Sequence, residues 1–305
     1  MDFISKLFID GGDPQETVKA NALLREKRPE WNRGIDGQTT NPTLVARNPD
    51  IQKYLAAGKK LTKDEILVEY KKIVEGVAVV TKGPISIQVI GDAHTPIEDF
   101  IAQARVYKEW IPNGVIKFPC TTNGLAAAEW FCAEFPVNIT LNFSQEQAAA
   151  VYAATRGAKH TVFISPFVGR LDDRGENGMD VVVNELRMYS HAARDSVGAL
   201  RDRETSEHTS HVQVLTASVR NLNHLLYAIK LASPAITIPF KVFQEWADGG
   251  FALPGDNFLY EMGGLSPISY REIPLNKPWQ EYNIQHDLTD VGITNFLSDW
   301  NAMLK

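Results

Sequence analysis

The sequence predicts an α/β fold, a single (β/α)8 barrel, and two observations carry that prediction. Eight short β-rich runs recur along the 305 residues, and helical patterns lie between them. A lysine, Lys117, lies in the middle of one apolar run, "GVIKFPC". Lysine is rarely buried without a reason, and a closed barrel has no edge strand for a lysine to protect. We therefore expect Lys117 to lie inside the barrel.

The expected strands share a β-rich composition and are followed by a loop and a helical pattern. They cover residues 6–12, 34–40, 84–91, 114–120, 137–143, 160–165, 212–218 and 235–240. An open, doubly wound sheet is the alternative, and it would require a GxGxxG turn after the first strand. The first turn, "FIDGGDPQ", has two adjacent glycines but lacks that motif. We therefore expect one barrel domain over 1–305, with a C-terminal loop and helix from about 241.

Two connections carry clear helix-starting signals. Thr95 and Glu98 form a capping-box pattern around Pro96, which would occupy the first helical position. Ser144 and Gln147 repeat the capping-box pattern, and the helix that they start is expected to end near residue 157.

The remaining connections are less regular. The connection 41–83 is long enough for two helices, and the sixth connection holds the polar loop "RLDDRGENGMD" before its helix. After the eighth strand come a helix, a glycine- and proline-rich loop and the amphipathic segment "LTDVGITNFLSDWNAML". We expect this last helix to pack on the barrel or on a neighbouring subunit.

Composition excludes several functional classes. A formal charge of −6 and a pI near 5.7 argue against binding to nucleic acid or to an anionic membrane surface. No run approaches the ~18 apolar residues of a membrane span, and the N-terminus lacks a secretory signal pattern. Two cysteines and seven histidines form no zinc-binding spacing, so we expect no metal and a cytoplasmic protein with reduced thiols.

Polar residues within otherwise apolar strands are the candidates for chemistry, because barrel active sites lie at the C-terminal ends of the strands. The candidates are Asp10, Gln88 with Ser86, Lys117, Asn138, Thr140 with Asn142, Ser165 and Ser218. Each has a structural alternative: Asp10 suits a turn, Gln88 a satisfied core position and Thr140 an ordinary strand. Asn41 in "TTNP" likewise suits the N-cap of a helix.

Together these residues point to one kind of chemistry. A buried ammonium is costly unless it is paired or its pKa falls, and a neutral lysine amine attacks carbonyls to form a Schiff base. Asp10 is placed to move protons, while Thr140 and Gln88 are placed to hold a water. Arg170 and Arg220 follow strand ends near the expected mouth; they are either solvated surface residues or a phosphate site. Lysine with two arginines suits a phosphorylated sugar ketone.

At this point the chain resembles the transaldolases, Schiff-base members of the class I aldolase barrels. The motifs that carry the resemblance occur in the family's order over most of the chain. They are "LFIDGGDP", "GIDGQTTNPTLVA", "ISIQVIGD", "VIKFPCTTNGLAAAEW", "VNITLNFSQEQA", "FISPFVGRLDD" and "LTASVRN". A single motif such as "TTNP" would be weak, whereas the ordered set is specific.

The resemblance implies roles for individual residues. Lys117 matches the Schiff-base lysine, Asp10 the aspartate that moves protons during carbon–carbon cleavage, and Thr140 the threonine that holds the catalytic water. Further positions match substrate contacts: Asn41, Asn138 and Ser165 for hydroxyls, Arg170, Ser218 and Arg220 for phosphate, and Phe167 as the aromatic residue of "SPFVGR". The implied reaction transfers a dihydroxyacetone unit between sugar phosphates and needs no metal or organic cofactor.

The chain departs from the family pattern at Gln88, where the usual transaldolase has glutamate. Related fructose-6-phosphate aldolases also have glutamine there and release free dihydroxyacetone, but they typically have tyrosine where this chain has Phe167. Segments 179–211 and 241–285 also fit the short family members poorly. The sequence thus does not decide whether the dihydroxyacetone unit is transferred or released by simple cleavage. It also does not decide whether the chain forms a homo-oligomer. A phosphosugar isomerase or epimerase with Asp10 as base, or a non-catalytic sugar-phosphate binding barrel, are the remaining alternatives.

Overall fold

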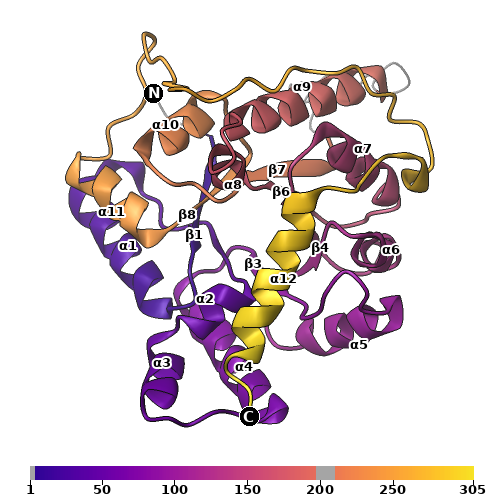
Figure 1. Ribbon diagram of the computed structural model, residues 1–305. Coiled ribbons are helices and arrows are strands. Elements are labelled where there is room, and N and C mark those ends of the chain that lie inside the picture. The colour runs from indigo at the N-terminus through magenta and orange to yellow at the C-terminus, as the bar shows by residue number, and fades with distance from the viewer. Residues whose placement is uncertain (1–3, 197–209) are drawn as a thin grey trace.

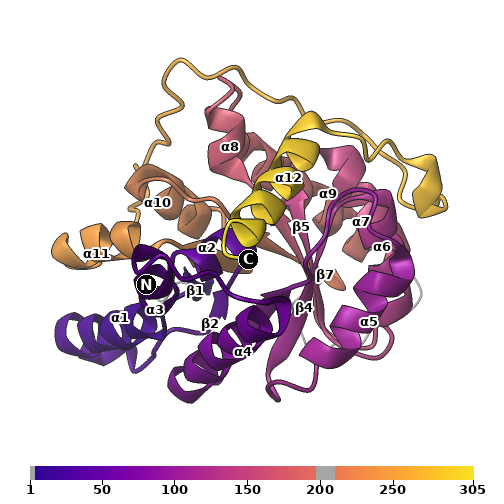
Figure 2. The ribbon, with the colours of Figure 1, turned by 60° about the horizontal axis from the view of Figure 1, so that its bottom comes forward.

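The computed structural model describes residues 4–196 and 210–305, and its centre is a closed barrel of eight parallel strands (Figure 1, Figure 2). The strands are β1 (Lys6–Asp10), β2 (Gly37–Thr39), β3 (Ile85–Gln88), β4 (Gly114–Pro119), β5 (Val137–Asn142), β6 (Val162–Pro166), β7 (Val212–Thr216) and β8 (Ala235–Ile238). Each strand pairs with its neighbours in the sequence, and β8 pairs with β1. The predicted (β/α)8 barrel is therefore confirmed, with strands shorter than the predicted runs.

Helices surround the barrel and alternate with its strands (Figure 2). They are α1 (Pro14–Lys27), α2 (Pro42–Ala46), α3 (Pro49–Ala56), α4 (Lys63–Val80), α5 (Ile97–Tyr107), α6 (Thr122–Phe131), α7 (Gln145–Ala154), α8 (Val168–Asp172), α9 (Gly178–Ser196), α10 (Leu222–Lys230), α11 (Phe240–Asp248) and α12 (Asp287–Asn301). Short 3₁₀ turns lie at Pro29–Trp31 and Trp279–Glu281. The connection 41–83 holds three helices where two were expected, because the short helix α2 begins directly after β2.

The predicted capping box at Thr95 is wrong. Helix α5 begins at Ile97 with Pro96 at the N-cap and no side-chain cap. The Thr95 hydroxyl instead accepts from the Asp92 amide at 2.9 Å and donates to the Asp92 carboxylate at 3.1 Å. Thr95 therefore closes the loop before the helix, and the helix starts one residue later than the sequence suggested.

The predicted capping box at Ser144 is half correct. The Ser144 hydroxyl accepts from the Gln147 amide at 3.2 Å, as expected of an N-cap. The Gln147 side chain does not return to Ser144: its oxygen accepts from the Phe143 amide at 2.8 Å, and its nitrogen donates to the Thr289 hydroxyl at 2.8 Å. Tertiary contact with α12 thus replaces the local contact, and α7 ends at Ala154 rather than near residue 157.

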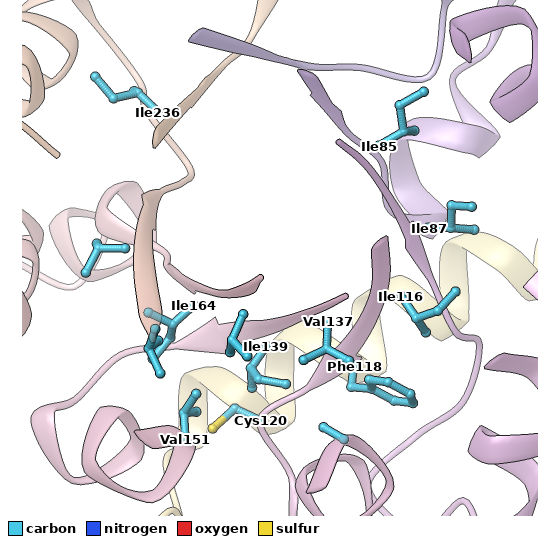
Figure 3. Packing of buried hydrophobic residues seen from close by; sticks show 14 of the residues in the cluster. Ile85, Ile87, Ile116, Phe118, Cys120, Val137, Ile139, Val151, Ile164 and Ile236 are labelled. Atoms are coloured by element: carbon cyan, nitrogen blue, oxygen red, sulfur yellow. The ribbon is translucent and has the colours of Figure 1, made fainter. Parts of the chain in front are cut away.

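The strand residues that face outward form the apolar layer under the helices. Ile85, Ile87, Ile116, Val137 and Ile139 belong to one buried cluster, and they point from the strands toward the surrounding helices (Figure 3). Such burial of branched side chains is the main favourable contribution to the stability of a barrel of this kind.

A second apolar cluster fills the lower part of the barrel interior. It consists of Phe8, Val115, Phe163, Leu215 and Ala235, all at most 2 % exposed. The rings of Phe8 and Phe163 meet edge to face, with centroids 5.9 Å apart. Because side chains alternate along a strand, the inward residues of the next layer lie two positions further along. This apolar floor therefore supports whatever the upper layer holds.

The C-terminal helix α12 packs on its own barrel, which was one of the two predicted positions. It crosses in front of the strands and ends beside α2 and α4 (Figure 1). The Thr289 hydroxyl donates to the Leu141 carbonyl at 2.9 Å, and the Thr43 hydroxyl of α2 donates to the Asp299 carboxylate. These contacts tie both ends of α12 to the C-terminal end of the barrel.

The segment between α11 and α12 runs along the outside of the barrel past α8, α9 and α7 (Figure 1). Ser266 forms two backbone hydrogen bonds, with the carbonyl of Gly175 at 2.7 Å and the amide of Asn177 at 2.8 Å. The Gln145 side chain forms another pair with the backbone of Arg271, at 2.8 and 3.1 Å. These bonds hold the segment that carries α12 across the mouth.

Candidate active site

The strand register places the predicted polar residues on the inner face of the barrel. Gln88 lies beside Lys117, and Lys117 lies beside Asn138. Thr140 lies beside Ser165 in the same way. Paired residues of adjacent parallel strands point to the same side of the sheet. The five side chains therefore all face the barrel interior, and together they form its polar layer.

Lys117 is 2 % exposed, and its Nζ donates to the Thr40 carbonyl at 3.2 Å. The Nζ lies 5.9 Å from the centroid of the Phe167 ring. Burial lowers the pKa of Lys117 to about 8; the nearby Asp10 carboxylate opposes this shift and the Arg170 charge adds to it. A substantial fraction of the amine is therefore neutral near physiological pH, as a nucleophile requires.

Asp10 lies at the end of β1 and is partly exposed. Its carboxylate accepts from the Thr39 hydroxyl at 2.7 Å, and the hydroxyls of Thr39 and Thr237 lie 2.6 Å apart. The carboxyl is nevertheless packed closely enough that burial raises the pKa of Asp10, against the opposing effects of Lys117 and of the Thr39 hydrogen bond. Such a group is suited to accept and return a proton.

A chain of hydrogen bonds fixes the amide of Asn138. Its nitrogen donates to the Ser86 hydroxyl at 3.0 Å, and its oxygen accepts from the Ser165 hydroxyl at 2.8 Å. The sequence placed Ser86 on the same face, and the structure gives it this orienting contact. The Asn138 side chain is therefore held in one orientation within the polar layer.

Two buried oxygens in this layer lack a partner within the described part of the chain. They are Oε1 of Gln88 and the hydroxyl of Thr140. Buried polar atoms are normally hydrogen-bonded, so an unsatisfied pair in a polar chamber marks a place for a water or a substrate hydroxyl. This observation supports the sequence-based expectation that Gln88 and Thr140 hold a water.

Asn41 forms the N-cap that the structural alternative predicted. Its side-chain oxygen accepts from the Leu44 amide at 3.0 Å at the start of α2. The residue before it, Thr40, supplies the carbonyl that accepts from Lys117. Asn41 therefore directly follows the residue that contacts the Lys117 amine, and its own side-chain oxygen caps α2.

The end of β5 is bent by a residue in an uncommon conformation. Leu141 has a φ of 62°, and the register with β6 shifts between Thr140 and Asn142. The Leu141 side chain lies in a cluster with Phe167 and with Phe296 of α12. The bulge therefore turns an apolar residue upward against the covering helix. The nitrogen of Asn142, which the sequence assigned to the inward face, has no partner among residues 4–196 and 210–305.

Two arginines lie together on the β6–β7 side of the mouth. The guanidinium of Arg170 lies over the rings of Phe167 and Phe296, at 5.5 and 5.3 Å from the centroids. Burial and the charge of Arg220 lower the pKa of Arg170, which indicates that the two cations are near each other. Arg220 is exposed and pairs with Asp173 at 2.9 Å. Adjacent guanidinium groups of this kind are suited to a phosphate.

Ser218 does not end its strand as the sequence suggested. Strand β7 ends at Thr216, and Ser218 follows in the left-handed region with a φ of 59°. Its carbonyl accepts from the Gly169 amide at 3.1 Å, which joins the β6 and β7 loops. Backbone strain of this kind clusters at ligand-binding sites. Ser218 is partly exposed beside Arg220, so the predicted phosphate-binding residues are brought together by two loops.

The mouth is covered on one side and open on the other. Helix α12 lies against α2 and β5, and the inner residues Lys117, Asn138 and Thr140 are buried. Asp10 and Ser218, from the β7–β8–β1 side, are partly exposed, and Arg220 is about half exposed. The β7–β8–β1 side of the mouth is therefore the side from which a small molecule could approach Lys117.

The comparison with known families fits this arrangement. The family Transaldolase/Fructose-6-phosphate aldolase matches residues 7–305. The chain belongs to this family. Similar proteins include the probable transaldolases of Heliobacterium modesticaldum (28% identical over 299 residues, 98% of each chain) and Anaeromyxobacter sp. strain K (32% over 302 residues, 98% of each chain). That of Citrifermentans bemidjiense is 29% identical over 301 residues, 98% of this chain and all of the relative.

Sequence reasoning missed several residues of this transaldolase-family site. Thr39 and Thr237 orient Asp10, and a threonine in a strand carries no signal that separates this role from strand preference. Phe296 and Gly292 of α12 contact or border Arg170, and their distance from it in the sequence hid the contact. A Cβ on Gly292 would lie 2.6 Å from Nη1 of Arg170, so a larger residue there would require the guanidinium to shift.

Two further observations concern the whole described chain. None of its helices is long and apolar enough to cross a membrane. Nowhere in residues 4–196 and 210–305 do three or more His, Cys, Asp or Glu side chains gather in a way that would hold a metal ion.

Proposed function

We propose that this protein catalyses a transaldolase-type transfer of a dihydroxyacetone unit from a ketose phosphate, such as fructose 6-phosphate, to an aldose phosphate. The observation that carries the proposal is the buried amine of Lys117, whose pKa is lowered to about 8, in a chamber with two unpartnered oxygens. The arginine pair at the rim supports a phosphorylated substrate. Family membership supports the same reaction class.

In the first step the neutral amine of Lys117 attacks C2 of the ketose, and the resulting carbinolamine loses water to give a protonated imine. The substrate phosphate binds Arg170, Arg220 and Ser218 at the rim. Hydroxyls near the imine bind Asn138, Ser165 and Asn41. The chain itself supplies every group that these steps use, so no metal or organic cofactor is required.

Cleavage then breaks the C3–C4 bond. A water held by Thr140 and Gln88, beside Asp10, takes the proton of the C4 hydroxyl, and the bonding electrons move into the imine to form an enamine. The aldose phosphate leaves, and the three-carbon unit stays on Lys117. Attack of the enamine on the carbonyl of a second aldose phosphate, followed by hydrolysis of the new imine, completes the transfer.

Simple aldol cleavage is the second candidate, and Gln88 is the observation that favours it. Glutamine orients a water but does not accept a proton, whereas glutamate does both. If the imine is hydrolysed faster than the enamine attacks an acceptor aldose, dihydroxyacetone is released. The free Oε1 of Gln88 is available to orient that hydrolytic water.

Borohydride reduction in the presence of fructose 6-phosphate, followed by mass mapping, tests the shared mechanism. We expect a covalent three-carbon adduct on Lys117, and its absence would overturn the proposal. Turnover measured with and without erythrose 4-phosphate then separates the two candidates. Product formation that needs no acceptor identifies the aldolase, and a Gln88→Glu variant that leaves the ratio of transfer to cleavage unchanged removes Gln88 as its cause.

A further inference from the structure

His224, in the first turn of α10, is a buried histidine that the proposed mechanism does not use. Only 2 % of its surface is exposed. The side chain of Asn221 accepts from the His224 amide at 2.9 Å and caps the helix, which fixes the histidine at the start of α10. This helix directly follows the loop that holds Ser218 and Arg220, so His224 is close in the chain to an arginine of the proposed phosphate site.

The two ring nitrogens of His224 face two different loops. Nδ1 accepts from the Arg220 amide, in the loop after β7, at 3.4 Å. Nε2 lies 2.7 Å from Oδ2 of Asp172, in the connection after β6. Because Nδ1 accepts a hydrogen bond, the proton of the neutral ring is on Nε2, where it faces the carboxylate. The imidazole is therefore a bridge between the backbone of Arg220 and the side chain of Asp172.

The carboxylate of Asp172 is held from a second side. Its Oδ1 accepts from the amide of Gly178, at the start of α9, at 2.9 Å. Each of its two oxygens therefore has a partner. Asp172 is also the last residue of α8, the short helix that carries Arg170. His224 thus joins the backbone of one arginine to the helix of the other.

The side chain of Arg220 lies across the start of α8. A Cβ on Gly169 would lie 2.3 Å from Nε of Arg220 and 2.5 Å from the carbonyl oxygen of Ser218. The guanidinium then reaches Asp173, at 2.9 Å. Because Arg220 packs this closely on α8, a displacement of its backbone relative to α8 would change the distance between its guanidinium and that of Arg170.

The segment between α11 and α12 contributes to the surroundings of His224. The ring of Tyr260 stacks on Tyr227, with centroids 4.4 Å apart, and its centroid lies 6.3 Å from that of the imidazole. The Tyr260 hydroxyl donates to the side-chain oxygen of Asn177 at 3.1 Å. The bridge is therefore enclosed by protein, where a hydrogen bond is stronger than it is in water.

We propose that His224, paired with Asp172, is a positioning residue for the phosphate site, which sets the backbone of Arg220 against α8 so that the two guanidinium groups meet one phosphate. The inference rests on the proposed function, in which Arg170 and Arg220 bind the substrate phosphate. Both ring nitrogens of His224 are engaged within the protein, so the histidine acts through Arg220 and not on the substrate.

The experiment replaces each half of the bridge in turn. In His224→Asn the amide oxygen can take the place of Nδ1 and accept from Arg220. In His224→Gln the amide nitrogen can take the place of Nε2 and donate to Asp172. We expect each variant to raise the Kd for inorganic phosphate and the KM for fructose 6-phosphate by about three- to tenfold, the effect of one lost hydrogen bond. The KM for unphosphorylated fructose should not change, and exposed His160→Asn is the matched control.

A double-mutant cycle separates this role from a purely structural one. In an Arg220→Ala background, the same His224 substitutions should change the Kd for inorganic phosphate by less than about twofold, because the group that they position is gone. Equal effects with and without Arg220 would overturn the inference. A loss of stability in urea unfolding with an unchanged phosphate affinity would also overturn it.

The other end of the bridge gives a second variant, which decides the matter if neither His224 variant folds. Asp172→Asn should raise the Kd for inorganic phosphate by about three- to tenfold, and an unchanged Kd would overturn the inference. Failure of the parent chain to bind inorganic phosphate would overturn the phosphate site together with this role. Absence of a trappable imine in a chain that binds phosphate would refute the proposed reaction, while the phosphate titrations would still decide the role of His224.

Discussion

The floor and the upper layer of the barrel interior are built by the same strands, two residues apart, and they differ completely in chemistry. On their strands, Phe8 is followed two positions later by Asp10, Val115 by Lys117 and Phe163 by Ser165. The lower member of each pair fills space, and the upper member holds a polar atom above it. The difference teaches that one alternation pattern supplies both an apolar support and a polar chamber, so substitutions in the two layers should affect different properties.

The largest effect is expected for Lys117→Met, in the upper layer. Removing the amine should lower kcat by more than about a thousandfold, because the proposed covalent step would have no substitute nucleophile. The free energy of unfolding should stay equal or rise, since a costly buried ammonium is replaced by an apolar chain. Steady-state kinetics and urea unfolding check both parts, with the exposed Lys63→Met as control. A stability loss of several kcal/mol would contradict this division of roles.

In the floor, Phe163→Ala should have the opposite profile. We expect a loss of about 3–5 kcal/mol in the free energy of unfolding, because the ring is fully buried and a cavity would remain. Trapping of the imine on Lys117 should survive at temperatures where the variant stays folded. A variant that keeps its stability but loses trapping would show that the floor takes part in the chemistry.

A smaller effect is expected where α12 meets the rim. A Cβ introduced by Gly292→Ala would lie 2.6 Å from both Nη1 of Arg170 and a methyl of Leu141. Displacing the guanidinium should raise KM for fructose 6-phosphate by about tenfold, in the range of a weakened charge-assisted hydrogen bond. The KM for unphosphorylated fructose should not change. Gly255→Ala, where no atom lies within 4 Å of the added Cβ, is the control.

The smallest effect concerns Glu185 of α9, a buried acid in the outer apolar layer. It is a change in the free energy of unfolding, which is smallest near pH 5 and grows with pH. Neither carboxylate oxygen has a partner in the described chain, and burial raises its pKa well above the usual value, with Cys120 and Tyr189 as its titratable neighbours. The folded state therefore keeps a proton that the unfolded state loses. Above the unfolded pKa of about 4.3, stability should fall with rising pH by up to about 1.4 kcal/mol per unit.

A Glu185→Met variant removes this proton linkage. Its free energy of unfolding should exceed that of the parent chain by an amount that grows as the pH rises from 5 toward neutrality. Denaturant unfolding at several pH values measures the difference. If the two pH profiles remain parallel, Glu185 is not buried as an uncharged acid.

The sequence predicted the barrel, the position of Lys117 and its inward neighbours because these depend on local alternation and on strand order. It did not predict features that depend on contacts between distant segments. Thr95 bonds to Asp92 in the preceding loop and does not cap α5, and the Gln147 side chain donates to Thr289 of α12. The residue types do not predict the left-handed backbone at Leu141 and Ser218, since neither residue is glycine or asparagine.

The order of the elements along the chain has a consequence for biosynthesis. Strand β1 closes the barrel against β8, with Lys6 beside Ala235, so the ring cannot close until most of the polypeptide has been made. Helix α12 follows still later. Domains of newly made chains form from the N-terminus, and pairings between distant segments form slowly. A nascent chain therefore carries the segment with Lys117 long before the barrel closes around it, and the covering of the amine is among the last events of folding.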